Sequence, residues 1–122
     1  MSHIDPPFLE PGSATIEDFQ RLDLRVARIV SADPLEGAGK PAYRLELDFG
    51  TGGRRRSSAQ LTRTYPDPSV LVGRLVVAVV NFPPRRVAGF RSEVLVLGAL
   101  APDGQIPLLG LDEGAAPGQR IG

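Results

Sequence analysis

The side chains that most often perform catalysis or bind metals are scarce in this sequence. Its 122 residues include one histidine, His3, and no cysteine. A zinc site would therefore depend on carboxylates alone, a ligand set that zinc rarely accepts. No glycine-rich loop followed by Lys-Ser or Lys-Thr is present, and no serine has a general base near it in the sequence. We therefore expect a protein that is not an enzyme and that has no catalytic residues, metal or cofactor.

Arginine is the residue type whose distribution is most informative. The formal net charge is zero, yet the segment 54–91 holds eight arginines and one acid, Asp67. Residues 1–53 carry five basic and nine acidic side chains, and residues 92–122 carry one basic and four acidic side chains. Because the planar guanidinium group binds phosphate and carboxylate groups, the central block favours an anionic partner. The alternative is that these arginines form ion pairs with the acidic flanks.

The apolar pattern predicts the strands that must position these arginines. Strands are expected at residues 22–30, 43–48, 54–58, 75–82, 94–97 and 106–109. The first two alternate apolar and polar residues, and Ile29 and Val30 break that alternation as a bulge does. The β-branched run 75–82 is typical of a central strand buried on both faces. Short strands separated by Gly- and Pro-rich turns predict an all-β fold, a small barrel.

Three local features lie outside these strands. A short helix is expected from Ile16 to Arg21, with its apolar side chains Ile16 and Phe19 docked on the core. A helical turn is expected at residues 61–65. Glu93, just before an apolar run, is interpreted as either a member of a buried ion pair or an anchor for a loop.

The length fits one folded unit. Residues 1–14 contain three prolines and little periodicity, so we expect a flexible N-terminal tail followed by one domain at 15–122. No apolar run approaches the ~20 residues that span a bilayer, and the N-terminus lacks the pattern of a signal peptide. We therefore expect a cytoplasmic protein without membrane insertion.

Two stretches of the sequence resemble a known family. They are Arg56–Leu61 and Val80–Leu95, the second of which contains Asn-Phe-Pro-Pro-Arg-Arg. Both resemble the tRNA-binding domain that some aminoacyl-tRNA synthetases carry. The double proline, the double arginine and the run Ser-Glu-Val-Leu-Val-Leu-Gly resemble the CsaA family of export-related chaperones. The resemblance covers residues 16–122 and implies a five-stranded OB-fold barrel with short capping helices, in a homodimer.

The apolar segment formed by Ile106, Leu108 and Leu109 either contributes to this dimer or closes the barrel. The resemblance further implies a chaperone that holds unfolded or precursor polypeptides for protein export without ATP. Its candidate peptide-binding residues are Phe82, Pro83, Pro84, Arg86 and Phe90. For Phe90 a core position that pins the loop to the barrel is the favoured alternative.

The second hypothesis is tRNA binding through a basic barrel surface, with phosphate contacts from arginine. Its candidate RNA-binding residues are Arg54, Arg55, Arg56, Ser57, Gln60, Asn81, Arg85, Arg86, Arg91 and Ser92. One departure weakens this hypothesis: the wider family often carries several lysines, and this chain has only Lys40 beside an acidic C-terminal third.

Overall fold

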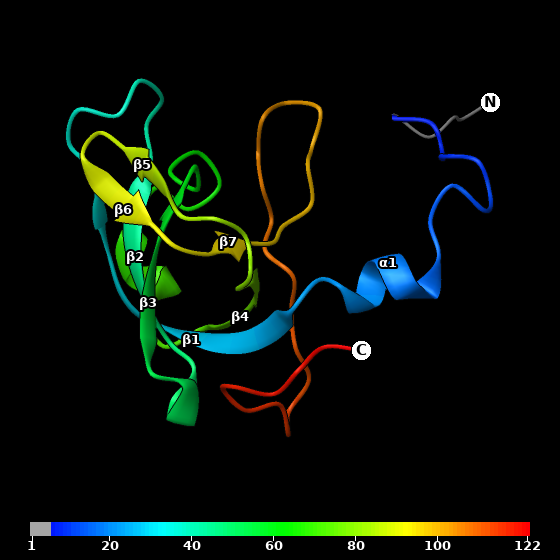
Figure 1. Ribbon diagram of the computed structural model, residues 1–122. Coiled ribbons are helices and arrows are strands. Elements are labelled where there is room, and N and C mark those ends of the chain that lie inside the picture. Colours follow the sequence, from blue (N-terminus) through cyan, green and yellow to red (C-terminus); the bar gives the residue numbers. More distant parts are fainter. Residues whose placement is uncertain (1–5) are drawn as a thin grey trace.

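The computed structural model describes residues 6–122, so His3 lies outside the described residues. The elements in chain order are α1 (Ile16–Gln20), β1 (Leu24–Pro34), β2 (Tyr43–Asp48), η1 (Gly50–Gly52), β3 (Arg54–Ala59), η2 (Pro68–Leu71), β4 (Leu75–Val79), β5 (Arg85–Val87), β6 (Phe90–Ser92) and β7 (Leu95–Val96) (Figure 1). None of the helices in this described part is long and apolar enough to cross a membrane.

Five strands form one antiparallel sheet in the order β3-β2-β1-β4-β7, and β5 and β6 form a separate hairpin. The long strand β1 lies at the centre because it pairs with both β2 and β4. Its pairing with β2 shifts register between Ile29 and Ser31, so the bulge predicted there is confirmed. The sheet curls into a nearly closed barrel, which confirms the all-β fold and the five-stranded barrel expected from the sequence.

The C-terminal segment covers the part of β1 that β2 leaves unpaired. The amide of Val26 donates to the carbonyl of Gln119 (2.9 Å), and the amides of Gly118 and Ile121 donate back to the carbonyls of Val26 and Leu24 (2.8 Å each). Gly118 has a φ of +92°, and a Cβ atom there would lie 2.6 Å from the carbonyl oxygen of Phe49. Only glycine fits at this crossing.

The core has two parts because β4 is buried on both faces. Inward-facing side chains such as Ile29, Leu45 and Val76 fill the barrel. On the other face of β4, Val77 and Val79 pack with Leu24 and with partly buried residues of the C-terminal segment. The two-faced burial predicted for the run 75–82 is therefore confirmed, although the strand itself ends at Val79.

Helix α1 forms as predicted, but it does not dock on the core. Thr15 and Asp18 make a reciprocal capping box, with hydrogen bonds of 2.9 and 3.2 Å. Ile16 is 63% exposed and Phe19 is 38% exposed, so the expected docking of these side chains is wrong. The reason is that α1 projects away from the barrel instead of lying across it (Figure 1).

The C-terminal apolar run is not the strand expected at 106–109. Only Leu108 makes a bridge, with Gly98, and its neighbour Pro107 has no amide hydrogen for a ladder. Leu108 is buried and Ile106 packs on the core, whereas Leu109 remains exposed. The turn predicted at 61–65 is present, closed by the amide of Tyr65 on the carbonyl of Leu61 (2.8 Å).

Candidate nucleic-acid interface

The β5–β6 hairpin presents the C-terminal end of the arginine block, with Arg85, Arg86 and Arg91. Its two-residue turn consists of Ala88 and Gly89, whose φ angles of +51° and +78° are those of a type I′ turn. Arg86 donates to the carbonyl of Gly89 (3.0 Å), so the guanidinium group is held beside the turn. Arg91 lies directly opposite Arg86 in the pairing register. The turn therefore places two like charges side by side at the tip of the hairpin.

The hairpin is fixed to the free edge of β3 just beyond its own C-terminal strand. The amide of Glu93 donates to the carbonyl of Arg56 (2.8 Å), and a carboxylate oxygen of Glu93 accepts from the amide of Arg56 (3.1 Å). The hydroxyl oxygen of Ser92 accepts from the amide of Ser58 (2.9 Å). These bonds satisfy edge-strand amides that would otherwise be exposed. The interpretation of Glu93 as a loop anchor is thereby confirmed.

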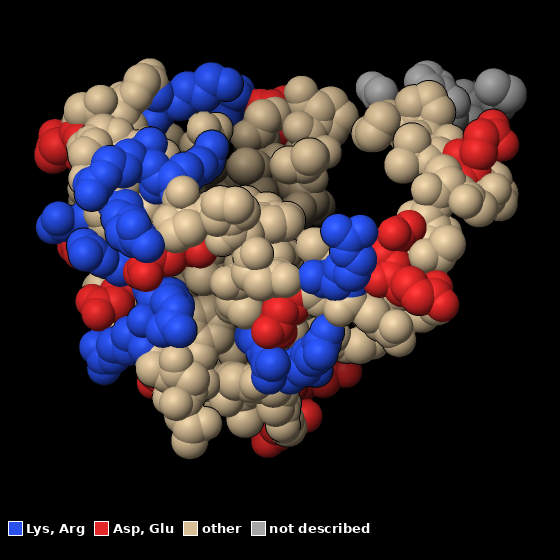
Figure 2. Space-filling model, viewed as in Figure 1, with Lys and Arg blue, Asp and Glu red and all other residues tan. Residues whose placement is uncertain are grey.

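A cleft lies between this hairpin and the loop that follows β1. Its volume is about 710 Å³. Its lining includes four arginines and two acids, Asp33 and Glu36, and Asp33 lies directly opposite Arg44 in the pairing of β1 with β2. We call this the arginine cleft and define its basic set as Arg44, Arg56, Arg86 and Arg91, with Phe90 beside them. Figure 2 shows the basic side chains gathered over the side of the molecule where β3, β5 and β6 lie.

The arginines of the cleft are not neutralised by acids. Among residues 6–122 the ion pairs join Arg25 and Arg120 to Asp23, and Arg54 to Glu46. None of them includes an arginine of the cleft. The alternative that the whole arginine block pairs with the acidic flanks therefore does not describe Arg56, Arg86 and Arg91, the three members of the block that line the cleft.

Three of the residues expected to contact RNA form hydrogen bonds within the fold. Ser57 is fully buried, and its hydroxyl donates to the carbonyl of Ser58 (3.0 Å). Ser92 is also buried, at the junction with β3. The side chain of Asn81 accepts from the amide of Asp23 and donates to the carbonyl of Arg21, both at 2.8 Å. Asn81 thus ties the end of β4 to the entrance of β1.

The remaining RNA candidates are spread over the surface. Arg56, Arg86 and Arg91 meet in the arginine cleft. Arg85 points to the other side of the hairpin, where it lines an apolar cavity together with Gln60. Arg54 is paired with Glu46 (3.8 Å) on the exposed face of the sheet. The structure therefore brings together only part of the set.

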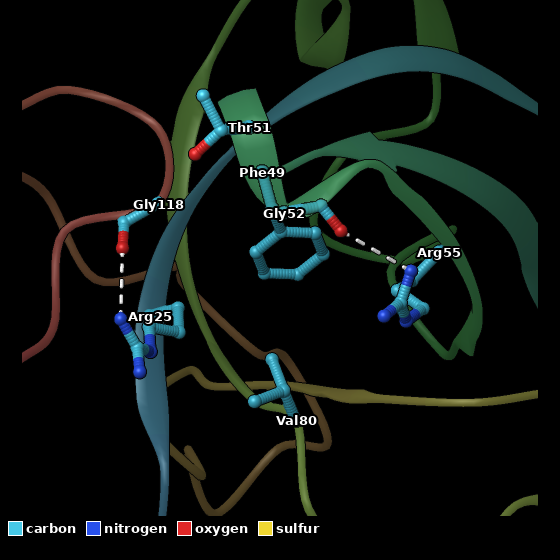
Figure 3. A pocket seen from close by; sticks show the side chains of 7 residues that line it. All are labelled: Arg25, Phe49, Thr51, Gly52, Arg55, Val80 and Gly118. Carbon is cyan, nitrogen blue, oxygen red and sulfur yellow. Dashed lines mark hydrogen bonds between the residues drawn. The ribbon is translucent and has the colours of Figure 1, made fainter.

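Arg55 belongs to a different pocket, at one end of the barrel (Figure 3). It lies opposite Leu47, and Arg25 lies opposite Ala78, so both arginines occupy inward-facing positions. Phe49 lies between them. Arg25 is held by Asp23 (2.6 Å) and donates to the carbonyl of Gly118 (3.1 Å), and the hydrogen bond to Asp23 raises the pKa of Arg25.

The peptide-binding candidates are also divided between two hollows. Phe82 is 42% exposed and lines one shallow hollow together with Pro83, and Pro84 is exposed beside them. Arg86 and Phe90 line the arginine cleft. Phe90 is half-buried and is absent from the core clusters, so the alternative that it is a core residue is not supported.

Two groups of lining residues were not among the candidates. An apolar cavity of about 390 Å³ lies beside β7, where Leu95, Leu100 and Ile106 line it. Leu95 also lines the hollow of Phe82, so the two apolar sites are adjacent. Arg44 is the other residue that was not predicted. The alternation of apolar and polar residues in the run 43–48 places Arg44 on the solvent-exposed face of the strand, and this pattern could have identified it.

Comparison with known proteins assigns the chain to one family. The model of the putative tRNA binding domain matches residues 24–120. Methionine–tRNA ligase of Neisseria meningitidis is 41% identical over 110 residues, which are 89% of this chain and 16% of that protein. The chain thus spans about a sixth of the length of the curated relatives that it matches.

Two solved structures match over nearly their whole length. The chaperone CsaA of Bacillus anthracis is 49% identical, with a TM-score of 0.83, and the match covers 89% of this chain and 98% of that one. The CsaA chaperone of Picrophilus torridus is 43% identical, with a TM-score of 0.81 and coverage of 89% and 99%. The chain belongs to the family of tRNA-binding domains, and its structure is similar to those of CsaA chaperones.

Proposed function

We propose that this protein binds tRNA through the arginine cleft, without catalysing a reaction. The observation that carries the proposal is the set of four arginines that line the cleft and form none of the ion pairs found among residues 6–122. A phosphate backbone supplies the missing negative charge, and guanidinium groups bind phosphate oxygens in pairs. Arg54, Arg55 and Arg85 lie at the periphery and add to the attraction at longer range. A tRNA ligand also accords with a cytoplasmic location.

The test measures tRNA affinity by fluorescence anisotropy as a function of salt. If four arginines contact phosphates, the affinity falls roughly 50- to 150-fold between 50 and 200 mM salt, because counterions are released on binding. The double variant Arg86→Gln/Arg91→Gln lowers the log–log salt slope by about two. The matched control Arg21→Gln/Arg63→Gln removes the same charge outside the cleft and leaves the slope close to wild type. An unchanged slope in the cleft variant contradicts the proposal.

A second candidate function is the holding of unfolded or precursor polypeptides, in the manner that the name of the CsaA chaperones implies. The observation that favours it is the adjacency of the apolar cavity beside β7 and the hollow at Phe82, which share Leu95. Apolar side chains of an unfolded segment fit such a surface, and the exposed Arg85 between the hollows attracts acidic residues. Holding of this kind acts by mass action and requires no nucleotide.

The chaperone proposal is tested by suppression of aggregation of a chemically unfolded client without ATP. Phe82→Ala and Leu95→Ser are expected to weaken the binding of the client, while the melting temperature stays nearly unchanged. The cleft variant Arg86→Gln/Arg91→Gln serves as the control and should retain holding activity. If both apolar variants hold the client as well as the wild type does, this surface is not a peptide site.

We further propose that the working unit is a homodimer. Apolar side chains are exposed on the segment before α1, on α1 itself and on the loop after β7, as in Phe8, Leu9, Ile16 and Leu100, the last being 81% exposed. Such a set of exposed apolar side chains is typical of an interface. Sedimentation equilibrium should give twice the mass of the chain, and Ile16→Ser/Phe19→Ser should shift the equilibrium toward the monomer. A monomeric wild type at micromolar concentration excludes this arrangement.

A further inference from the structure

The side chain of Arg56 does not form an ion pair with the acid that lies opposite it in the sheet. Its cross-strand neighbour on β2 is Glu46, and opposite charges at such positions usually attract. Instead the guanidinium carbon of Arg56 lies 5.3 Å from the centre of the Phe90 ring. The carboxylate of Glu46 is 3.8 Å from Arg54. The cation therefore lies over an aromatic ring and makes no ion pair with an acid.

The backbone around Arg56 makes this arrangement rigid. Both the amide and the carbonyl of Arg56 are bonded to Glu93, so β3 and the hairpin cannot separate without breaking two hydrogen bonds. Phe90 is only half-buried, and its strand is held by the turn at Ala88 and Gly89. Guanidinium groups stack on planar groups such as aromatic rings and bases.

The hairpin that lines the same cleft supplies a complementary feature. Arg86 and Arg91 stand opposite one another on the hairpin, and like charges at such positions repel. A phosphate group that binds between them removes the repulsion and accepts hydrogen bonds from both. Asp33 and Glu36 also line the cleft. Carboxylates also accept hydrogen bonds from a ribose 2′-hydroxyl, which DNA lacks.

From this geometry we propose that the arginine cleft binds an unpaired nucleotide of RNA. The base stacks on the outer face of Arg56, and the adjacent phosphate binds between Arg86 and Arg91. The cleft volume of about 710 Å³ lies within the ~300–1,000 Å³ that is typical of ligand sites. A base inside a duplex is already stacked on both faces, so the cleft selects loops or single-stranded ends. This inference rests on the proposed RNA-binding function and specifies which part of the RNA is bound.

The test compares a hairpin RNA that carries a loop of unpaired bases with a fully paired duplex of equal phosphate number. A 2-aminopurine in the loop reports stacking by its loss of fluorescence. The key variant is Arg56→Lys, which keeps the charge but removes the plane. Its matched control is Arg54→Lys on the same strand, and Phe90→Leu removes the ring beneath Arg56.

We expect the wild type to bind the loop RNA about ten-fold more tightly than the duplex, since stacking of one base supplies a preference of this order. Arg56→Lys should reduce the preference to less than two-fold and abolish the fluorescence quench. Arg54→Lys should retain both the preference and the quench. Equal affinity of the wild type for loop and duplex, or a preference unaltered in Arg56→Lys, overturns the inference while RNA binding itself stands. Binding of neither RNA overturns the proposed function together with it.

Discussion

Replacement of Arg91 by glutamine should make the free protein more stable and its complex with tRNA weaker. Arg91 and Arg86 face each other one pair out from the two-residue turn. In a two-residue hairpin this is a non-hydrogen-bonded pair, where the Cβ atoms lie only about 5 Å apart. Arg91 donates no hydrogen bond in the structure, whereas Arg86 donates to the carbonyl of Gly89. Arg91→Gln thus removes the repulsion and retains this bond.

The expected magnitude follows from the exposure of both side chains. Two like unit charges about 6 Å apart in water repel by roughly 0.7 kcal/mol, and salt screens part of this. We therefore expect Arg91→Gln to raise the free energy of unfolding by about 0.5 kcal/mol at low salt. For a domain of this size the corresponding increase in melting temperature is about 2 °C. Loss of one charged contact to phosphate should weaken tRNA binding about ten-fold.

Thermal melts at 20 and 500 mM salt, together with anisotropy titrations of tRNA, measure both effects. The gain in stability should shrink at the higher salt, and the salt slope of binding should decrease by about one. Arg63→Gln is the matched control, because this substitution removes the same charge from a residue that does not line the cleft. A loss of stability in Arg91→Gln, or an affinity equal to that of the wild type, would refute the reasoning about this pair.

Three further substitutions test structural features of the fold, and a fourth tests the cause of the lowered pKa of Asp67. Ala88→Asn should raise stability by about 0.5–1 kcal/mol in urea melts, since asparagine tolerates the positive φ of +51° better than alanine does; no gain would show that the turn is unstrained. Asn81→Ala should lower stability by about 1 kcal/mol with unchanged tRNA affinity, because both bonds of its amide are internal; reduced affinity at unchanged stability would instead make Asn81 an RNA contact. Gly118→Ala should cost more than about 2 kcal/mol, because its Cβ atom meets a backbone carbonyl at 2.6 Å; a wild-type melt would exclude this close approach. Hydrogen bonds from Ser69 lower the pKa of Asp67, so this carboxylate contributes stability above its unfolded pKa that is lost as pH falls through the folded pKa. Ser69→Ala should raise that pKa toward its ordinary value in an NMR titration, and an unshifted titration would contradict the assigned cause.

Local patterns were sufficient for most of the elements. The capping box at Thr15, the alternation from Tyr43 to Asp48 and the bulge near Ile29 were all predictable, because each depends on residues close together in the sequence. The docking of α1 was not predictable, since an apolar side chain on a short helix can face its own core or remain exposed. The pattern of Ile16 and Phe19 is the same in both cases.

The candidate site was predictable only as a region. The eight arginines between residues 54 and 91 mark it by charge, and charge can be counted without a structure. Which of them share a cleft depends on register: Arg55 lies opposite Leu47 and therefore faces inward, while Arg56 faces the hairpin. A shift of one position along β3 would exchange the two.

The sequence by itself determined the class of this domain: an all-β barrel with one histidine and no cysteine, and with its positive charge concentrated in the middle of the chain. The tertiary structure alone decided which side chains meet. Arg44 comes from β2, Arg56 from β3, and Arg86 and Arg91 from the hairpin, so contacts across three segments form the cleft. The physical reason is that strand composition depends on local burial, whereas a binding site depends on pairing register and on long-range hydrogen bonds such as those of Glu93.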